Sequence, residues 1–398
     1  MKILFVHEVS YRKKVIFEMH EFPELLALKG HVVSFLEFDE GRKFWKKSLA
    51  PRHQVTEGRV HSDASVKIYR PFQLGIPGVD RLLATLTVIP QIRRLLKKSD
   101  FDAVVLYAVP TYGLQTLWFG KKYRVPIIFR SLDVSHKIRS SVLSPAIKWI
   151  ERRIYRKVDL LSGNNPAMAS YCNQLGQRTK ETKVHFPPLD LSHFQDGPRD
   201  AALRNSLGFS ANDRVLVYMG SFFYFSGLVA ALTEFAKLAK SNSTLKFLLI
   251  GGGEQDQKLR KLAIELDVQD QVVFTGFIGY QDLPRYLKAG DVAVSTLELT
   301  LVANVAFPNK VLQYLAAGLP VVSTQLEGLF SVFESEKSIV WESDPTSVIR
   351  RAIQFTSHEL SDLSPGKSTE LALAKFSPKH AVAQFEADLQ ALAEEFEE

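Results

Sequence analysis

Short apolar runs alternate with longer amphipathic stretches along the whole chain. Continuous apolar runs are typical of strands buried on both faces of a parallel sheet, whereas apolar residues that recur every three or four positions are typical of helices. In the first half the pattern predicts strands over residues 3–6, 32–36, 103–107, 126–129 and 160–162, with helices over 18–29 and 81–98. Proline removes a helix hydrogen bond, so Pro90 should bend the second helix.

The second half of the chain shows the same alternation. It predicts strands over residues 214–218, 245–250, 271–275, 291–295 and 320–323, and helices over 228–240, 255–266, 281–289 and 310–317. Alternating strands and helices build mostly parallel sheets covered on both faces. A chain of 398 residues also exceeds the size of one ordinary core, so we predict an α/β protein of two doubly wound domains.

Adjacent prolines mark the boundary between the two domains. Pro187 and Pro188 exclude both a helix and a central strand, which predicts a linker at this point. We therefore assign residues 1–186 to the first domain and residues 187–377 to the second. In the last stretch, 378–398, apolar residues at helical spacing predict an amphipathic helix. They are Ala381, Phe385, Leu389 and Leu392.

Composition narrows the class of protein and its compartment. Hydrophobic residues make up 46% of the chain and charged residues 23%, which is the composition of a folded globular protein. The single cysteine, Cys172, has no disulfide partner, and we interpret it as a small buried side chain in a reducing compartment. No apolar run is long enough for a signal sequence or a membrane-spanning helix, which predicts a cytoplasmic protein.

Charge is distributed unevenly along the chain. Residues 1–190 hold 32 Lys and Arg against 17 Asp and Glu, whereas the remaining residues hold 18 against 26. A basic half favours an anionic partner, such as an anionic lipid surface, a nucleic acid or a phosphorylated acceptor. A basic face that is merely solvated is the alternative.

Several basic residues lie among aromatic residues on predicted helices. Such a combination suits a bilayer interface, so we predict peripheral contact with the inner face of the membrane. The candidate residues are Arg93, Arg94, Lys97, Lys98, Trp149, Arg152, Arg153 and Arg156, with residues 44–47 nearby in the sequence. Nucleic-acid binding competes with this interpretation, but no known nucleic-acid-binding motif accompanies the basic residues. We therefore predict no nucleic-acid partner.

The loops that follow strands of the second half contain candidates for a phosphate-binding site. Open parallel sheets bind ligands at the carboxyl ends of their strands, and glycine lets a backbone N–H approach a phosphate. The candidates are Gly220 and Ser221 after one strand, Gly251, Gly252 and Glu254 after the next, and Phe277 after a third, where an apolar loop would line a planar base. A tight turn without a ligand is the alternative for the glycines.

The strongest candidate segment covers residues 307–322. Pro308 or Asn309 is predicted to start a helix, whose first turn presents free N–H groups beside the Lys310 ammonium. Together these groups form a predicted anion site. Gln313 lies one turn later on the same side and is placed to bind ribose hydroxyls.

On these segments the chain resembles the family-four glycosyltransferases of the GT-B fold. Similar segments run nearly end to end, at residues 2–6, 25–33, 187–194, 217–221, 249–254, 272–294 and 310–322, and at 376–377 before the terminal helix. The resemblance implies two Rossmann-like domains that face each other across a cleft. It places the acceptor on the first domain and a nucleotide-sugar donor on the second, and it implies that helix 378–398 crosses back to the first domain.

The donor domain departs from the pattern of this family. The resemblance implies an Arg and a Lys that hold the donor diphosphate, but Phe222, Phe225 and Ser226 stand in that loop. The two glutamates of the E-x7-E motif would fall on Val305 and Gln313. We expect Glu298 to substitute for the missing carboxylate, and Lys310 for the missing cations, as in a divergent branch with a Pro-Asn-Lys motif.

The first domain departs from the family pattern as well. The family's histidine after the fourth strand has no counterpart in register, and the nearest candidates for orienting a hydroxyl are Asp133 and His136. A capping aspartate and a surface histidine are the alternatives. The usual glycine pair of the first loop is replaced by residues 9–14.

The sequence as a whole predicts a hexosyltransferase that uses a nucleotide-diphosphate sugar. The expected acceptor is anionic, lipid-linked or a polysaccharide, and the resemblance implies retention of configuration. Helix N-termini and Lys310 can take the charge of the leaving diphosphate, so neither a metal nor another cofactor is implied. The main alternative is a non-catalytic GT-B partner subunit, which the loss of the family's charged residues would favour. A GT-B sugar-nucleotide epimerase is disfavoured, because a basic, aromatic first domain indicates a large anionic acceptor.

Overall fold

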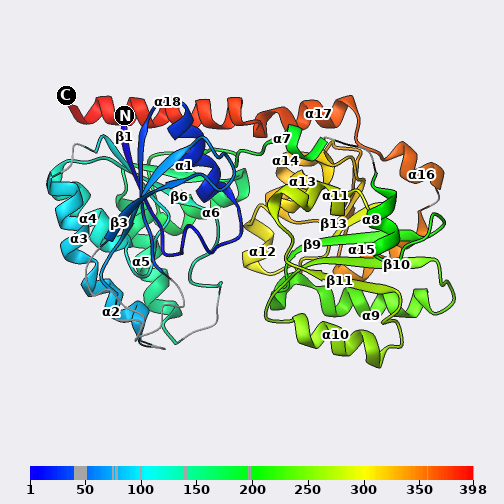
Figure 1. The fold of residues 1–398 in the computed structure, drawn as a ribbon. Helices are drawn as coiled ribbons and strands as arrows, with labels where there is room; N and C mark the ends of the chain where they lie inside the picture. Colours follow the sequence, from blue (N-terminus) through cyan, green and yellow to red (C-terminus); the bar gives the residue numbers. More distant parts are fainter. Residues whose placement is uncertain are drawn as a thin grey trace. The chain divides into compact units, whose positions relative to one another are not determined.

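The chain folds into two compact units. The computed structural model describes residues 1–39, 52–73, 76, 79–98, 101–138, 142–195, 197, 199–355 and 357–397. Unit 1 consists of Met1–Pro188 together with Pro378–Glu398, and unit 2 of Leu189–Ser377. The chain therefore passes from unit 1 to unit 2 directly after the two prolines and returns for the last helix (Figure 1).

Unit 1 is built on an eight-stranded sheet of the described residues, in the order β3-β4-β2-β1-β5-β6-β7-β8. Its strands are β1 (Lys2–Val6), β2 (Val32–Leu36), β3 (Arg52–Glu57), β4 (Ser65–Arg70), β5 (Ala103–Leu106), β6 (Ile127–Ser131), β7 (Leu160–Gly163) and β8 (Lys183–Val184). All neighbouring strands are parallel except β3, which pairs antiparallel to β4. The five predicted strands are present, and β3, β4 and β8, which lie towards the sheet edges, were not predicted.

Two helices from opposite ends of the chain cover one face of this sheet. They are α1 (Glu18–Leu28) and α18 (Pro378–Glu397), and they contact each other. Phe22 of α1 and Phe385 of α18 are fully buried, with ring centroids 4.5 Å apart. Both pack with Phe5 and Phe35 of the central strands in one hydrophobic cluster. The predicted terminal helix thus completes the core of unit 1.

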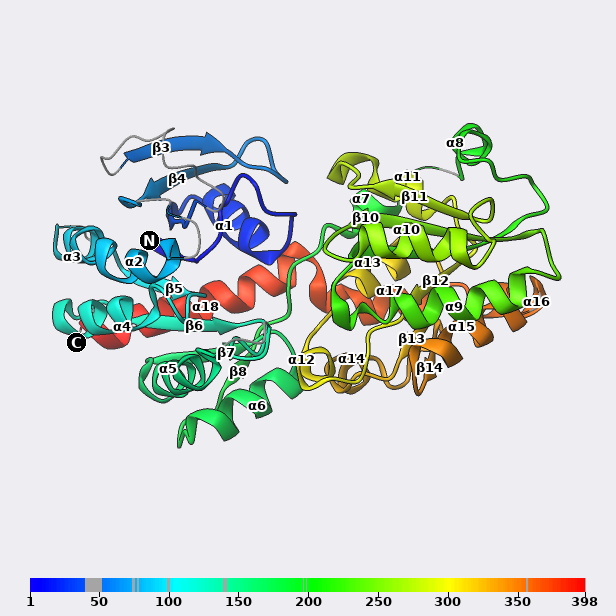
Figure 2. The same cartoon turned by 90° about the horizontal axis from the view of Figure 1, so that it is seen from below.

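The remaining helices of unit 1 form a row along the chain. They are α2 (Asp80–Thr87), α3 (Ile89–Lys98), α4 (Gly113–Tyr123), α5 (Ser144–Lys157) and α6 (Pro166–Gly176). Successive members from α3 to α6 contact each other, and Figure 2 shows them side by side. The predicted helix 81–98 is interrupted at Val88, two residues before Pro90, which is the second residue of α3.

In the described residues of unit 2, six parallel strands form a sheet in the order β11-β10-β9-β12-β13-β14. Its strands are β9 (Arg214–Ser221), β10 (Leu245–Gly252), β11 (Val272–Gly276), β12 (Val292–Ser295), β13 (Val321–Thr324) and β14 (Ile339–Glu342). The two doubly wound α/β domains predicted from the sequence are therefore confirmed. Only β14 among these strands was not predicted.

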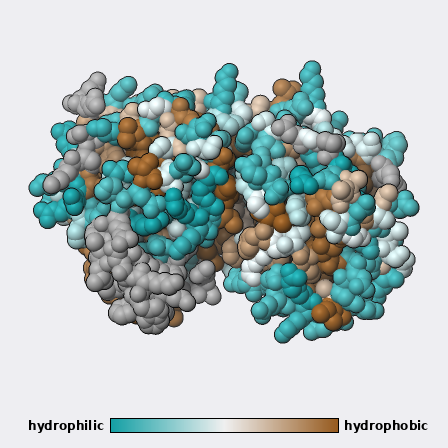
Figure 3. Space-filling model, in the orientation of Figure 1, coloured by the Kyte–Doolittle hydropathy of each residue, from teal (hydrophilic) through white to brown (hydrophobic). Residues whose placement is uncertain are grey.

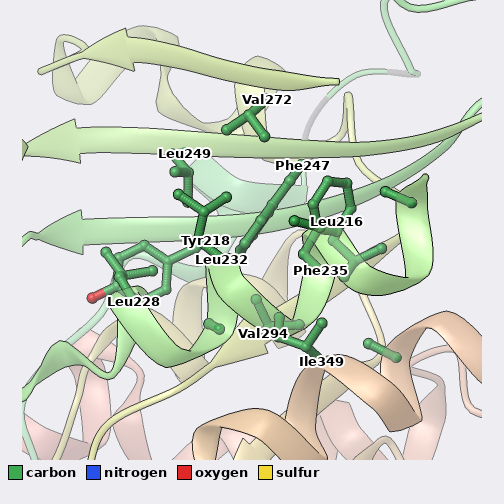
Figure 4. Close-up of a cluster of buried hydrophobic side chains, with 14 of the residues drawn as sticks. Leu216, Tyr218, Leu228, Leu232, Phe235, Phe247, Leu249, Val272, Val294 and Ile349 are labelled. Atoms are coloured by element: carbon green, nitrogen blue, oxygen red, sulfur yellow. The ribbon is translucent and has the colours of Figure 1, made fainter. Parts of the chain in front are cut away.

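The core of unit 2 lies between one face of its sheet and two helices, α9 (Leu228–Ala239) and α15 (Pro345–Gln354). Leu216 of β9 and Phe247 of β10 lie near Phe235 of α9, the Tyr218 ring of β9 lies beside Leu228, and Ile349 of α15 closes the cluster (Figure 4). These side chains are all buried.

Shorter helices connect the strands of unit 2. They are α7 (Leu191–Gln195), α8 (Ala201–Ser206), α10 (Asp256–Glu265), α11 (Leu283–Leu287), α12 (Leu301–Val305), α13 (Lys310–Ala316), α14 (Glu327–Phe333), α16 (Ser357–Asp362) and α17 (Lys367–Leu373), with 3-10 turns η1 (Tyr224–Ser226), η2 (Tyr280–Asp282) and η3 (Ala374–Phe376). Hydrophilic residues cover most of the described surface seen in Figure 3. In the described part of the chain, no helix combines the length and the apolar character needed to cross a membrane.

The packing of α18 on unit 1 makes a testable prediction. Phe385→Ala removes a buried ring that contacts Phe22, so we expect it to lower the free energy of unfolding of unit 1 by about 3–5 kcal/mol. Hydrogen exchange at peptides from β1 and β5 measures this loss. Gln390→Ala changes an exposed residue of the same helix and serves as the control. Equal exchange in the two variants would show that α18 does not stabilise this core.

Candidate functional site

Strands β9 and β12 of unit 2 separate towards their carboxyl ends. The two strands pair only at Leu216 with Val292 and at Val217 with Ala293. The chain leads from β9 to β10 on one side and from β12 to β13 on the other, so the strand order reverses at this point. Such a switch point, at the carboxyl ends of the strands, is where open α/β sheets bind ligands.

Glycines bring the ends of β9 and β10 into direct backbone contact. Gly220 and Gly251 have φ angles of 136° and 125°, which residues with side chains rarely adopt. A Cβ atom on Gly251 would lie 2.1 Å from the carbonyl oxygen of Gly220. The Phe222 N–H, directly after β9, donates to the carbonyl of Gly252, the last residue of β10, over 2.9 Å. Gly251 is therefore required by close backbone packing, and Gly220 by its positive φ angle.

The side chain of Lys310 reaches the end of β9. Its Nζ lies 3.9 Å from the centroid of the Tyr218 ring and 3.6 Å from the position that a Cβ atom would take on Gly220. The ammonium has no hydrogen bond or ion pair with any residue that the structure describes. The residue keeps some exposed surface, but the surrounding protein desolvates its ammonium and lowers its pKa from 10.5 to about 7. This is a cation without a compensating carboxylate.

Helix α13 carries Lys310 as its first residue. The predicted start at Pro308 or Asn309 is one residue early or more, since Asn309 is the N-cap and its side chain makes no capping hydrogen bond. Gln313 is partly exposed one turn after Lys310. The helix has only seven residues, so the Lys310 ammonium rather than a long helix dipole carries the positive charge here.

Tyr314 ties this helix to β9 and was missed by the sequence analysis. Its hydroxyl accepts the N–H of Met219 over 2.6 Å, and its side chain is fully buried. Nothing in the sequence distinguishes this tyrosine from a core residue, because the contact depends on where the helix crosses the strand.

The other predicted donor-site residues lie around the same strand ends. Phe277 follows β11, is 64% exposed, and lies 3.2 Å from the Cβ position of Gly252. Ser221 ends β9, and its carbonyl oxygen accepts from the Tyr218 hydroxyl over 3.4 Å. Glu254 and Glu298 are exposed. The Glu298 N–H donates to the Phe225 carbonyl, which connects the loops after β9 and β12.

Residues at which the sequence departs from the family pattern lie in buried positions. Phe222 is fully buried in the core of unit 2, and Ser226 is 1% exposed. The loop from Phe222 to Gly227 therefore offers no cation to the carboxyl ends of β9 and β12. Val305, at the first position of the expected carboxylate pair, is buried on α12.

Asp133 and His136 of unit 1 have different surroundings. Asp133 follows β6 and is exposed at the surface, yet nearby protein and the Glu18 carboxylate raise its pKa from 3.8 to about 6. His136 is buried, and its Nδ1 lies 2.7 Å from the buried Glu151 carboxylate. Glu151 also accepts from the Tyr155 hydroxyl. Of the two, Asp133 is the accessible carboxyl, and His136 is held within the fold.

A histidine that the sequence analysis missed lies at the end of β1. The His7 ring stacks on the Tyr107 ring with centroids 5.1 Å apart. Its Nδ1 accepts the Glu8 N–H over 2.8 Å, so the neutral ring carries its proton on Nε2. Burial first, and then the charge of Lys14, lower the pKa of His7 to about 3. His7 is thus a neutral hydrogen-bond donor beside the strand ends of unit 1.

Cations and exposed tryptophans lie together on the helices of unit 1. Trp149 on α5 is 58% exposed and has Arg153 over its ring at 5.7 Å. Trp118 on the neighbouring α4 is 57% exposed and has Lys122 over its ring at 4.9 Å. The predicted residues Arg93, Arg94, Lys97, Arg152 and Arg156 are also exposed. The Lys98 side chain and residues 44–47 lie outside the described residues.

Two protein-family models match the chain. The model for "Glycosyl transferase 4-like domain" matches residues 22–189, and the model for "Glycosyl transferases group 1" matches residues 213–358. The first falls within unit 1 except for its last residue, and the second falls within unit 2.

Relatives and solved structures agree with these matches. N-acetyl-alpha-D-glucosaminyl L-malate synthase of Bacillus anthracis is 23% identical over 92% of this chain and 91% of its own length. Alpha-monoglucosyldiacylglycerol synthase of Streptococcus pneumoniae is 23% identical over 58% of this chain, which spans about half (53%) of that relative. The crystal structure of Anabaena Alr3699/HepE in complex with UDP has a TM-score of 0.72 at 19% identity, covering 98% of this chain and 100% of that one.

The uncompensated Lys310 predicts a gain of stability on its removal. The pKa of Lys310 is about 7 in the folded chain and 10.5 in the unfolded chain. Below pH 7 the group is charged in both states, so the whole free-energy cost of burying its charge lowers the stability of the fold. This cost decreases as the pH rises from 7 towards 10.5. We expect Lys310→Met to raise the melting temperature of the unliganded protein at pH 6.5, and the difference to shrink by pH 10. Lys240→Met, at an exposed lysine of unit 2, is the control, and a lower melting temperature for Lys310→Met at pH 6.5 would contradict this account.

Proposed function

The chain is a GT-B glycosyltransferase, and we propose that it transfers a hexose from a nucleotide-diphosphate donor held on unit 2. The observation that supports the donor site most directly is the unpaired Lys310 ammonium at the switch point of the sheet. An anion bound there replaces a missing partner and does not compete with an existing carboxylate. A diphosphate supplies such an anion, and the UDP bound by the structural neighbour Alr3699/HepE is a diphosphate of this kind.

Each of the other strand-end residues has a role in this proposal. Gly220, Gly251 and Gly252 carry no side chain of their own, and in this proposal their backbone N–H groups approach the phosphates. Phe277 offers an exposed ring for stacking of the base. Ser221, Glu254, Asn309 and Pro308 border the same site, and Gln313 and Glu298 bind hydroxyls of the ribose or the sugar.

The leaving diphosphate determines the chemistry of the donor side. Negative charge grows on it as the glycosidic bond breaks, and a fixed ammonium in a partly desolvated site stabilises that charge. The proposal assigns this task to Lys310 without a metal or another cofactor. In the described part of the chain, no group of three or more His, Cys, Asp or Glu side chains is arranged to hold a metal ion. Retention of configuration is part of the proposal.

Unit 1 supplies the acceptor side of the reaction in this proposal. Asp133 is accessible, and its pKa of about 6 lets it accept and release a proton near neutral pH. It orients the acceptor hydroxyl. His136, whose Nδ1 is engaged by Glu151, positions this loop. The His7 Nε2–H is an additional donor for an acceptor oxygen.

The basic surface of unit 1 favours an acceptor that is anionic or lipid-linked. The name of one relative, alpha-monoglucosyldiacylglycerol synthase, includes diacylglycerol, which is a lipid. The exposed rings of Trp118 and Trp149, with cations over their faces, suit the interfacial region of an anionic bilayer. We propose that these helices bring the protein to the cytoplasmic face of the membrane without crossing it.

The donor assignment predicts the effect of removing Lys310. Lys310→Met should weaken binding of UDP and of UDP-glucose by about 1.5–3 kcal/mol, the range of a charge-assisted hydrogen bond. Uridine lacks phosphates and should bind both proteins equally. Isothermal titration calorimetry measures all three ligands. Equal UDP affinities would remove Lys310 from the site, and a wild type that binds no nucleotide diphosphate would favour the non-catalytic subunit.

The proposed membrane contact predicts binding that depends on charge and salt. The wild type should co-sediment with vesicles containing anionic phosphatidylserine, and added salt should weaken this binding, because exposed charges are screened over about 8–10 Å. The double variant Trp118→Ser, Trp149→Ser should bind more weakly. Lys240→Ala on unit 2 is the control. Equal binding to neutral phosphatidylcholine vesicles, or unchanged binding of the double variant, would remove the proposal.

A further inference from the structure

We propose that Tyr218 and Tyr314 position Lys310 as an uncompensated charge at the end of β9, so that one lysine serves as the diphosphate site. This inference rests on the donor role proposed above. It extends that role because it explains how a lone cation is held at the end of β9 without a carboxylate. It also assigns a function to two tyrosines that otherwise look like core residues.

Tyr218 supplies the surface on which the ammonium rests. Its side chain is fully buried, and the Lys310 Nζ lies 3.9 Å from the ring centroid, inside the range of a cation–π contact. The electron-rich face attracts the ammonium but carries no net charge. A carboxylate at this position would neutralise Lys310 and would repel a phosphate, whereas an aromatic ring leaves the positive field available.

Tyr314 determines where the lysine can reach. It lies four residues after Lys310 on α13, on the same side of the helix. Its hydroxyl accepts the Met219 N–H over 2.6 Å, directly before Gly220. Pairing of β9 with β12 ends at Val217, so the phenol takes up a backbone donor where the neighbouring strand has turned away. One hydrogen bond therefore holds the start of α13 against the strand end.

The two contacts supply a positive charge that the loop after β9 lacks. Phe222 is buried and the segment after it contains no cation, so the diphosphate charge depends on a residue that approaches from another element. A flexible lysine in open solvent would lose much side-chain freedom on binding an anion. The Tyr218 ring and the Tyr314 hydroxyl restrict Lys310 before the ligand arrives, which reduces that loss.

The test compares three variants by calorimetry with pyrophosphate, which needs no base recognition. Tyr218→Leu should lower pyrophosphate affinity about tenfold, whereas Tyr218→Phe keeps the ring and should stay within about threefold of the wild type. Tyr314→Phe removes one oxygen and should lower the affinity about fivefold. Uridine affinity should remain unchanged in all three. Because Tyr314→Phe barely alters the core volume, it keeps the proposal testable if Tyr218→Leu does not fold.

A pH profile separates positioning of the charge from a general loss of packing. UDP-glucose has no phosphate group that titrates near neutrality, so its affinity for the wild type should fall as Lys310 loses its proton above pH 7. Without the ring the ammonium is less favoured, and in Tyr218→Leu the fall should begin at a lower pH. A tyrosine that only fills space would leave the profile in place.

The outcomes distinguish this inference from the donor assignment on which it rests. If the wild type binds neither pyrophosphate nor UDP-glucose, the donor assignment fails. If the wild type binds both, and Tyr218→Leu and Tyr314→Phe match its affinity and pH profile, the donor site stands and the positioning role is overturned.

Discussion

Strands β9 and β12 remain paired for two residue pairs and then separate, and the arrangement of unit 2 around its ligand edge depends on that separation. Backbone groups that leave a sheet need other partners. Tyr314 takes one of them, the Met219 N–H. The same separation makes room for the Lys310 side chain beside Gly220. The separation of the two strands thus leaves a backbone N–H for Tyr314 and places Lys310 at the same strand end.

Unit 1 depends on a charge pair inside its core. Arg130 is 1% exposed and forms two hydrogen bonds with the Glu18 carboxylate, at 2.7 and 2.8 Å. Tyr107 also donates to Glu18, and Arg130 donates to Ser162 of β7. A buried pair of this kind contributes little net stability compared with apolar residues, but removing one partner is costly. The pair therefore restricts the orientation of side chains at the strand ends, Tyr107 beneath His7 among them.

The sequence predicted well what depends on local pattern, and poorly what depends on crossing elements. The central strands and α18 follow from apolar spacing, and the place of Lys310 in the first turn of a helix follows from Pro308 and Asn309 before it. The Tyr218 ring beneath Lys310 could not be predicted, because the contact joins residues far apart in the chain. The contact between His136 and Glu151 also joins residues on different elements, so nothing in the sequence indicated that this histidine is buried and hydrogen-bonded.

The division of unit 1 into two segments has a consequence for synthesis on the ribosome. Phe22 packs against Phe385, which is made only after all of unit 2. At roughly 5–20 residues per second, translation of the intervening segment Leu189–Ser377 takes about 10–40 s. During that interval Phe22 lacks the cover of Phe385, and unit 2 receives its last residue, Ser377, before α18 is made. The nascent protein therefore finishes its second unit first, and its first unit is the one that a chaperone would have to protect.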